Sequence, residues 1–356
     1  MDLLKLTEKY PTEAACYAKI ERVRWGNRPV CPKCGCTRIT KRTARKNYYH
    51  CNACNRDFTA LYGTIFEGSK MPLRKWFILI SMMLNAKKGI SAKNLSRSVG
   101  VTYKTAWYSA MRVRCAMLDW GEELEGIVEM DETYVGGKPR KRNRPLPSSD
   151  NTADLSKIYD RTDVSVKRGR GTKKVPVAGI VERKGRVVAK VMSGLTSKEL
   201  LAMLKRSVKM KDTTLMTDDF RSYNAMDAEI ERFVVKHSAK EYARGAVHTN
   251  TIEGFWSIIK NGIKGSYTKI SRAYLPFYLA EYTYRYNRRQ LSPSEAFEET
   301  VENAVESEKP FTGYKPVRDA RKIAYPPKNR GRRKKPACKS TGKRGKKKTA
   351  VSSRKK

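Results

Sequence analysis

The sequence predicts a mixed α/β fold with a central sheet, preceded by a small cysteine-rich module and a helical segment. Three observations support this order. Cysteines near the N-terminus form two Cys-x2-Cys pairs, and apolar residues recur at helical spacing between residues 73 and 118. From residue 126 onward, short apolar strand-like segments alternate with amphipathic helical ones, which is the pattern of a mixed sheet covered by helices.

The composition restricts the class of partner. The 356 residues include 76 Lys and Arg against 35 Asp and Glu, which gives a net charge of +41. A chain this basic is expected to bind a polyanion such as nucleic acid, in the nucleoid of a prokaryote or the nucleus of a eukaryotic or viral host. The longest apolar run, Trp76 to Leu84, is about half as long as a membrane-spanning helix needs, so we expect no membrane segment.

The basic charge is concentrated in particular segments. Residues 328–356 hold 15 Lys or Arg and no acid, and they contain few large apolar groups. We expect a disordered arm there that holds DNA without sequence preference, joined to the rest by a linker at 301–327. The polar, Arg-rich stretch 138–174 is predicted to be a mobile basic loop.

The cysteine spacing predicts a structural zinc site. The motifs CPKCG and YHCNAC are separated so that 16 residues lie between the two pairs, and their members are Cys31, Cys34, Cys51 and Cys54. Four thiolates at this spacing can bind one Zn2+ tetrahedrally, and the metal stabilises a segment too short to fold on its own core. We therefore predict a zinc ribbon within residues 1–70, with Cys36 outside the ligand set. The spacing leaves open whether the ribbon contacts DNA, contacts protein or only folds.

Residues 71–125 are predicted to form a helical DNA-binding segment. Ser91 can cap one helix and Thr102 the next, with a tight turn at Gly100 between them. In a helix-turn-helix the second helix enters the major groove, and here it would present Tyr103 and Lys104 to DNA. An ordinary helical hairpin is the alternative; the net charge favours the DNA-binding interpretation.

Acidic residues at strand ends predict a second metal site. Asp131 lies in the apolar strand that starts near residue 126, and Asp218 ends a second apolar strand. A later helix carries Asn250, Glu253 and Lys260 on one polar face. Carboxylates from two strands and a helix can bind hard divalent cations that serve phosphoryl transfer. Alternatively, Asn250 and Glu253 form a capping box that needs no catalysis, and both roles are compatible.

In combination, these motifs resemble a known family. The segments CPKCG, YHCNAC, MDETYVGGK, TDDFRSY and NTIEGFW are similar to those of the DDE-type insertion-sequence transposases in the group numbered fifteen-ninety-five, over about Thr12 to Phe297. The resemblance implies a ribonuclease H-like catalytic domain at 126–300, which uses Mg2+ or Mn2+ to cleave DNA at element ends and to join them to target DNA.

The resemblance also assigns individual residues. It implies Asp131 and Asp218 as the first two acids, and Glu253 or Asn250 as the third, with Glu253 preferred for its charge. Lys260 matches a lysine of the family's catalytic region. Arg285 and Arg288 are expected on a DNA-facing helix. The implied partners are terminal inverted repeats and target DNA, with a homo-oligomer forming when two ends are paired.

Two other functions use the same features differently. A nonenzymatic zinc-ribbon and helix-turn-helix protein with a degenerate core would bind specific DNA without cleaving it. A structure-specific nuclease on the same fold would cleave DNA without a joining step. The combination of motifs favours the transposase, and the other two functions are the alternatives.

Overall fold

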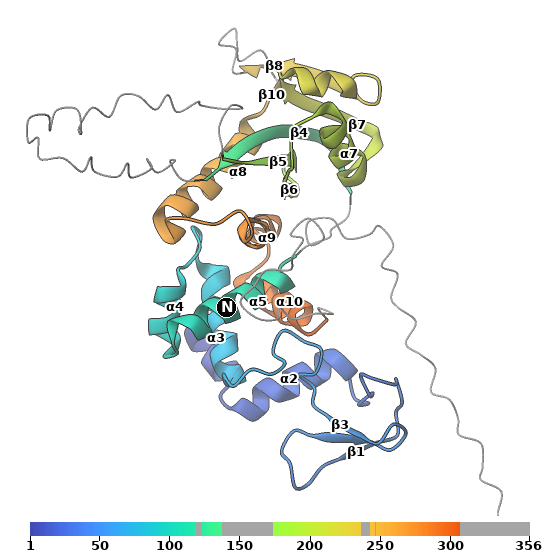
Figure 1. The fold of residues 1–356 in the computed structure, drawn as a ribbon, viewed down its shortest axis with the longest axis vertical. Helices are drawn as coiled ribbons and strands as arrows, with labels where there is room; N and C mark the ends of the chain where they lie inside the picture. Colours follow the sequence, from blue (N-terminus) through green and yellow to red (C-terminus); the bar gives the residue numbers. More distant parts are fainter. Residues whose placement is uncertain (119–122, 137–173, 236–242, 246, 307–356) are drawn as a thin grey trace, which may run out of the picture.

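The computed structural model describes residues 1–118, 123–136, 174–235, 243–245 and 247–306. The expected arm at 328–356, the expected loop apart from its last residue, and the segment 307–327 lie outside the described residues. The molecule is elongated, with the large sheet at one end and the cysteine-rich module at the other (Figure 1). Of the helices in the described ranges, none is long and apolar enough to cross a membrane.

The cysteine-rich module contains a small antiparallel sheet in the order β1-β2-β3. Its strands are β1 (Ile39–Lys41), β2 (Tyr49–Cys51) and β3 (Arg56–Phe58). Tyr49 and Phe58 are buried in its core, and the ring of Trp25 packs edge-on against them at centroid distances of 5.1 and 5.8 Å. Because Trp25 ends helix α2 (Glu13–Trp25), this aromatic contact fixes the module to the helical part of the chain.

The middle of the molecule is a helical body built from both ends of the described chain. Its helices are α1 (Leu3–Lys9), α2, α3 (Leu73–Asn85), α4 (Ala92–Val99), α5 (Tyr103–Ala116) and α10 (Pro293–Glu306). Helix α10 inserts Phe297 and Val301 into the core that the first helices form, and Phe297 lies 5.5 Å from the ring of Phe77. The predicted domain limit at 300 and the linker predicted from 301 are therefore wrong, because both fall inside α10.

Helices α4 and α5 follow one another across a tight turn, and both predicted caps are formed. The Ser91 side chain accepts a hydrogen bond from the backbone N–H of Asn94, and Thr102 accepts one from Thr105. Gly100 ends α4 in the left-handed conformation, with φ of 65°, which glycine adopts without steric cost. Tyr103 is 53% exposed at the start of α5, so this end of the helix is open to a partner.

The large sheet has the strand order β6-β5-β4-β7-β8. Its strands are β4 (Leu124–Val135), β5 (Val175–Glu182), β6 (Val187–Val191), β7 (Val208–Asp218) and β8 (Glu231–Val235). The first three form an antiparallel meander, whereas β7 and β8 run parallel to β4. Helix α7 (Ser197–Ser207) connects β6 to β7. This topology is that of the predicted ribonuclease H-like fold.

Alternation along the strands gives the sheet two apolar faces. Met130 and Ile180 point to one side and pack with Leu200 and Leu204 of α7. Their strand neighbours point to the other side, where helix α8 (Asn250–Gly262) covers Val177 and Val181 with an apolar face that includes Trp256. Two short strands, β9 (Ala243–Arg244) and β10 (Val247–His248), precede α8.

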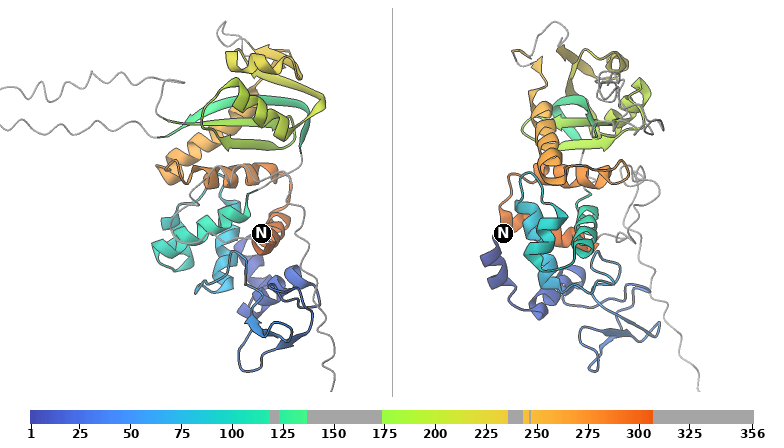
Figure 2. Two further views of the ribbon diagram at one scale, coloured as in Figure 1. Left: turned by 45° about the vertical axis from the view of Figure 1, so that its right-hand side comes forward. Right: turned by 60° about the vertical axis from the view of Figure 1, so that its left-hand side comes forward.

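Helix α9 (Leu275–Asn287) lies between the sheet and the helical body, as the orange helix in Figure 2 shows. Here Arg114 of α5 and Glu281 of α9 are almost fully buried, and the Arg114 Nε donates to Glu281 Oε2 at 2.7 Å. The hydroxyl of Tyr267, at the end of the π-helical turn η4 (Ile263–Tyr267), donates to the same carboxylate. These hydrogen bonds satisfy a charge pair that would be costly to bury unpaired.

We predict that α10 contributes to the stability of the helical body. Phe297→Ala should lower the free energy of unfolding by about 3–5 kcal/mol, because it removes a fully buried ring and leaves a cavity. Phe233→Ala is the matched control, since that ring is 39% exposed on β8, and it should cost less than about 1 kcal/mol. Denaturant unfolding of the two variants measures both values; equal losses would contradict the placement of α10 in the core.

Candidate functional site

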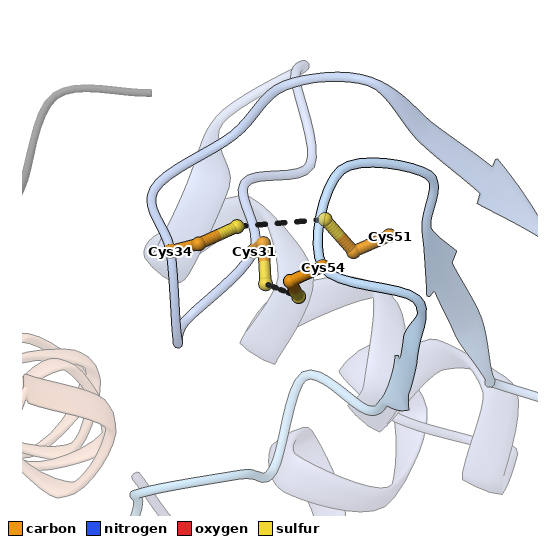
Figure 3. A group of neighbouring side chains, drawn as sticks. All are labelled: Cys31, Cys34, Cys51 and Cys54. Atoms are coloured by element: carbon orange, nitrogen blue, oxygen red, sulfur yellow. Dashed lines mark hydrogen bonds between the residues drawn. The ribbon is translucent and has the colours of Figure 1, made fainter. Parts of the chain in front are cut away.

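The two predicted cysteine pairs come together at one end of the cysteine-rich module. Sγ of Cys31 lies 3.7 Å from Sγ of Cys54, and Sγ of Cys34 lies 3.6 Å from Sγ of Cys51 (Figure 3). All four sulfur atoms lie within 4.8 Å of one another. A tetrahedral zinc site with Zn–S bonds of about 2.3 Å places its sulfurs about 3.8 Å apart. The arrangement therefore fits one zinc ion.

The surroundings of this cluster agree with a cation site. Burial, and then the neighbouring thiols, raise the pKa of Cys54 to about 12, so four thiolates in this space need a positive charge among them. Cys36 is buried nearby but lies outside the cluster, as the spacing predicts. Its Sγ accepts a hydrogen bond from the backbone N–H of Arg38 at 3.4 Å.

A second cluster forms at the large sheet, where Asp131, Glu132 and Asp218 each place a carboxylate oxygen within 4.8 Å of the other two. Strand pairing explains why Asp131 and Asp218 meet. β4 and β7 are adjacent and parallel, with Met130 opposite Thr217, so the next residue on each strand is an aspartate. The two acids predicted from the sequence are therefore side by side.

The electrostatics of this cluster favour a bound cation. Burial, and then the negative charge of Glu132, raise the pKa of Asp131 to about 7, and Asp218 contributes in the same direction. A divalent cation between the carboxylates would remove the repulsion that causes part of this shift. The donor atoms are all carboxylate oxygens, which suits hard ions such as Mg2+ or Mn2+.

Sequence reasoning missed Glu132. Alternation along a strand points adjacent side chains to opposite faces, so a site at Asp131 does not by itself predict that Glu132 joins it. The structure allows it because the Glu132 carboxylate is held by Tyr223, whose hydroxyl donates to Oε2 at 2.8 Å. Tyr223 is fully buried in the turn η2 (Arg221–Met226), just after Asp218. The available signal was a pair of adjacent acids in a chain that has few.

Of the predicted third-acid candidates, Glu253 falls outside this group of carboxylates in the described chain. Asn250, Glu253 and Lys260 are on the exposed polar face of α8, as expected, but Glu253 is not among the clustered acids of the described chain. Its Oε1 accepts a hydrogen bond from the Thr249 hydroxyl at 3.3 Å. The capping-box prediction is wrong, because Thr249 is the N-cap, its side chain accepts no hydrogen bond from the helix backbone, and Asn250 is the first helical residue.

The N-terminus of α8 is instead capped by an acid from the sheet. Glu129 of β4 is fully buried, and its Oε2 accepts hydrogen bonds from the backbone N–H groups of Thr251 and Ile252 at 2.8 and 3.0 Å. Its Oε1 accepts from Arg183 Nε at 2.7 Å. A carboxylate here satisfies unpaired helix N–H groups and interacts favourably with the helix dipole.

Arg285 and Arg288 do not have the expected DNA-facing orientation. The Arg285 side chain is 11% exposed, lies 3.6 Å from Glu281 and packs on the Tyr282 ring. The Arg288 side chain is 14% exposed, and its Nε donates to Glu299 of α10 at 2.8 Å. Helical spacing placed both arginines on one helix but did not show that Glu281 and Glu299 pair with them.

Comparisons with known proteins identify both modules. A transposase zinc-ribbon domain matches residues 11–57, and an ISXO2-like transposase domain of the same group matches residues 123–287. An uncharacterized protein in transposable element ISH50 of Halobacterium salinarum is 28% identical over 80% of this chain and 95% of its own length. An uncharacterized transposase-like protein of Haemophilus influenzae is 29% identical over 30% of this chain and 86% of its own length.

Solved structures with some likeness include a pre-cleavage Mos1 transpososome, at 13% identity and a TM-score of 0.27, covering 66% of this chain and 79% of that one. Another is a Mos1 mariner paired end complex with Mn, at 13% identity and a TM-score of 0.25, covering 86% and 93%. The family assignment rests on the two domain matches, which together span more than half of the sequence. The chain thus belongs to the DDE-type insertion-sequence transposases of the fifteen-ninety-five group.

Proposed function

We propose that this protein cleaves DNA at the ends of a mobile element and joins the freed 3′ hydroxyl groups to target DNA. The observation that carries the proposal is the meeting of Asp131 and Asp218, where parallel β4 and β7 place two carboxylates at one point. Carboxylates this close, in a chain with a net charge of +41, are explained by a cation that they hold in common.

In this proposal Asp131 and Asp218 bind Mg2+ or Mn2+. When bound, such ions make the attacking oxygen more nucleophilic and stabilise the leaving oxygen. Proximity favours Glu132 as a further ligand, whereas the family resemblance favours Glu253 or Asn250. Lys260, exposed two turns beyond Glu253 on α8, is placed to contact a DNA phosphate.

The helix-turn-helix supports binding to DNA. Tyr103 and Lys104 are exposed in the first turn of α5, the part of a recognition helix that contacts base edges and phosphates. The cysteine-rich module adds a basic hairpin with exposed Lys41, Arg45 and Lys46. We propose that the helix-turn-helix reads the terminal inverted repeats and that the hairpin holds the backbone. Two copies of the chain are needed to pair two ends.

The four clustered cysteines support a structural role for zinc. We propose that Cys31, Cys34, Cys51 and Cys54 bind one Zn2+, which folds the module and leaves its basic hairpin exposed. A module this small buries only a few side chains, so the metal supplies part of its folding free energy.

The first prediction concerns the acids. Asp131→Asn and Asp218→Asn should each lower cleavage of DNA with terminal inverted repeats by about 10³-fold, because the cations supply several kcal/mol of transition-state stabilisation. The measurement is product formation in Mg2+ on labelled ends. Glu231→Gln, an exposed acid on β8, is the control and should cleave normally.

The same assay separates the alternatives. Glu132→Gln and Glu253→Gln are compared in the same assay. The third ligand is the residue whose substitution lowers DNA cleavage as much as Asp131→Asn does. Joined products with target DNA support a transposase, whereas cleavage without joining indicates a nuclease. Specific binding with no cleavage in any divalent metal would leave only a DNA-binding protein.

The second prediction concerns zinc. Cys34→Ser should reduce bound zinc from about one per chain to well below one half, and should expose the module to proteolysis. Cys36→Ser should keep its zinc, since its sulfur lies outside the cluster. Elemental analysis of both purified variants tests the assignment; undiminished zinc in Cys34→Ser would reject it.

The third prediction concerns the helix-turn-helix. Lys104→Ala should weaken DNA affinity and reduce the slope of log affinity against log salt by about 1, because one phosphate contact is lost. Lys198→Ala removes an equally exposed lysine from α7 and should leave the slope unchanged. Titrations at several salt concentrations measure the slope, and identical slopes for both variants would exclude Lys104 from the interface.

A further inference from the structure

We infer that Trp256 is a positioning residue for Asp131, and that Gly179 gives it the space to act. This inference rests on the proposed function, since it concerns how the acid is oriented toward a cation. Its basis is a contact between helix and sheet that the motif spacing does not reveal. Trp256 lies on the apolar face of α8, and Asp131 lies on β4 beneath it.

The contact is a directional hydrogen bond inside the core. The indole Nε1 of Trp256 donates to Asp131 Oδ2 at 3.0 Å, and the Trp256 side chain is 2% exposed. A buried indole is held by its neighbours, so it presents its N–H in one direction only. One oxygen of the aspartate is therefore fixed, which sets the plane of the carboxylate and the direction in which its second oxygen points.

Gly179 is the reason that the indole can reach this position. It is the direct cross-strand partner of Asp131 on β5. A Cβ atom built there would lie 2.6 and 2.7 Å from two ring carbons of Trp256, and 3.1 Å from Cδ1 of Ile252. A glycine inside a strand weakens the strand, and close approach of another group is the usual reason for it. Here that group is the indole ring.

A second contact sets the direction of α8 along β4. Glu129, two residues before Asp131 on the same side of the strand, accepts from Thr251 and Ile252 at the start of α8. Two strand residues advance about 6.7 Å, and the five helical residues from Thr251 to Trp256 advance about 7.5 Å. Because the steps nearly match, both hydrogen-bonded contacts form at once, and α8 is aligned with the strand that carries the acid.

This arrangement couples the two parts of the proposed site. Glu253 lies one helical turn before Trp256 on α8, so the Trp256 and Glu129 contacts fix both the Asp131 carboxylate and the position of Glu253 relative to it. Partners that orient a metal ligand typically change metal affinity or activity about 10- to 100-fold when they are removed. A tryptophan that only fills the core would not have this effect.

The structure offers a matched control for packing. Trp76 is also buried, at 1% exposure, and its Nε1 donates to the Ser69 hydroxyl at 3.1 Å within the helical body. Trp256→Phe and Trp76→Phe each remove a buried indole and one hydrogen bond. Both should lower the unfolding temperature, and only the first should affect the acids. Gly179→Ala is an additional variant that displaces the indole while keeping every tryptophan.

The experiment measures Mn2+ binding to the full-length, zinc-loaded protein by electron paramagnetic resonance. We expect Trp256→Phe and Gly179→Ala to weaken Mn2+ binding about 10-fold or more, and Trp76→Phe to bind as the wild type does. In cleavage assays the Mg2+ concentration for half-maximal rate should rise similarly in the first two variants, with unchanged affinity for end DNA. Wild-type Mn2+ affinity in both Trp256→Phe and Gly179→Ala would overturn the inference, and so would equal weakening in Trp76→Phe.

Asp131→Asn separates this inference from the proposed function. If Asp131→Asn binds Mn2+ as tightly as the wild type, the metal assignment itself fails. If Asp131→Asn loses Mn2+ binding while Trp256→Phe and Gly179→Ala keep it, the metal site stands and only the positioning role is rejected. If Trp256→Phe does not fold, Gly179→Ala alone decides the outcome.

Discussion

The parallel pairing of β4 with β7 is the constraint on which the proposed site depends. It places Asp131 and Asp218 at equivalent points of neighbouring strands, although they are far apart in the sequence. The repulsion between these carboxylates and Glu132 raises the pKa of Asp131, so the site by itself opposes folding with all three groups charged. The surrounding structure must hold the strands in register against this cost, and a bound cation would relieve it.

Other buried acids supply part of that support. Glu129 and Glu281 are both fully buried, yet each is paired with an arginine and with hydroxyl or N–H donors. Truncating one partner would leave an uncompensated buried charge. These pairs therefore stabilise only an arrangement in which both partners stay in contact. The chain has 35 acids and 76 bases. Of these acids, Glu129 connects a strand to a helix, and Glu281 connects two helices. Scarce carboxylates therefore organise the scaffold as well as the proposed metal site.

The sequence predicted those features that depend on local spacing. The cysteine cluster, the caps at Ser91 and Thr102, the sheet class and the meeting of Asp131 with Asp218 all follow from periodicity, capping chemistry or motif spacing. Glu132 was missed because strand alternation does not predict that two adjacent side chains meet at one site. Its position depends on Tyr223, which reaches it from another segment.

The remaining errors have the same physical origin. The predicted domain limit at residue 300 was wrong because an amphipathic helix has the same sequence pattern in either domain. The pattern of α10 does not show that its apolar face packs on the first helices of the chain. Arg285 looked exposed because a basic residue near a helix end usually is. Glu281 and the Tyr282 ring, together with the helices packed around them, instead enclose it. Burial by segments that are distant in the sequence is what pattern reasoning lacks.

Contacts between distant segments also connect helices α4 and α5 to the acid cluster. The Arg114–Glu281 pair fixes α5 to α9, and the Tyr282 hydroxyl donates to the backbone oxygen of Lys88 just before α4. Gly89 lets Tyr267 approach the same loop, since a Cβ there would lie 2.2 Å from its hydroxyl oxygen. These contacts join the helical body to α9 and the turn before it, and α9 packs against β6 of the sheet, so α4 and α5 are connected to the acid cluster by packed structure. In the proposed function, this packing would set the distance between the bases that α5 contacts and the bond that is cleaved.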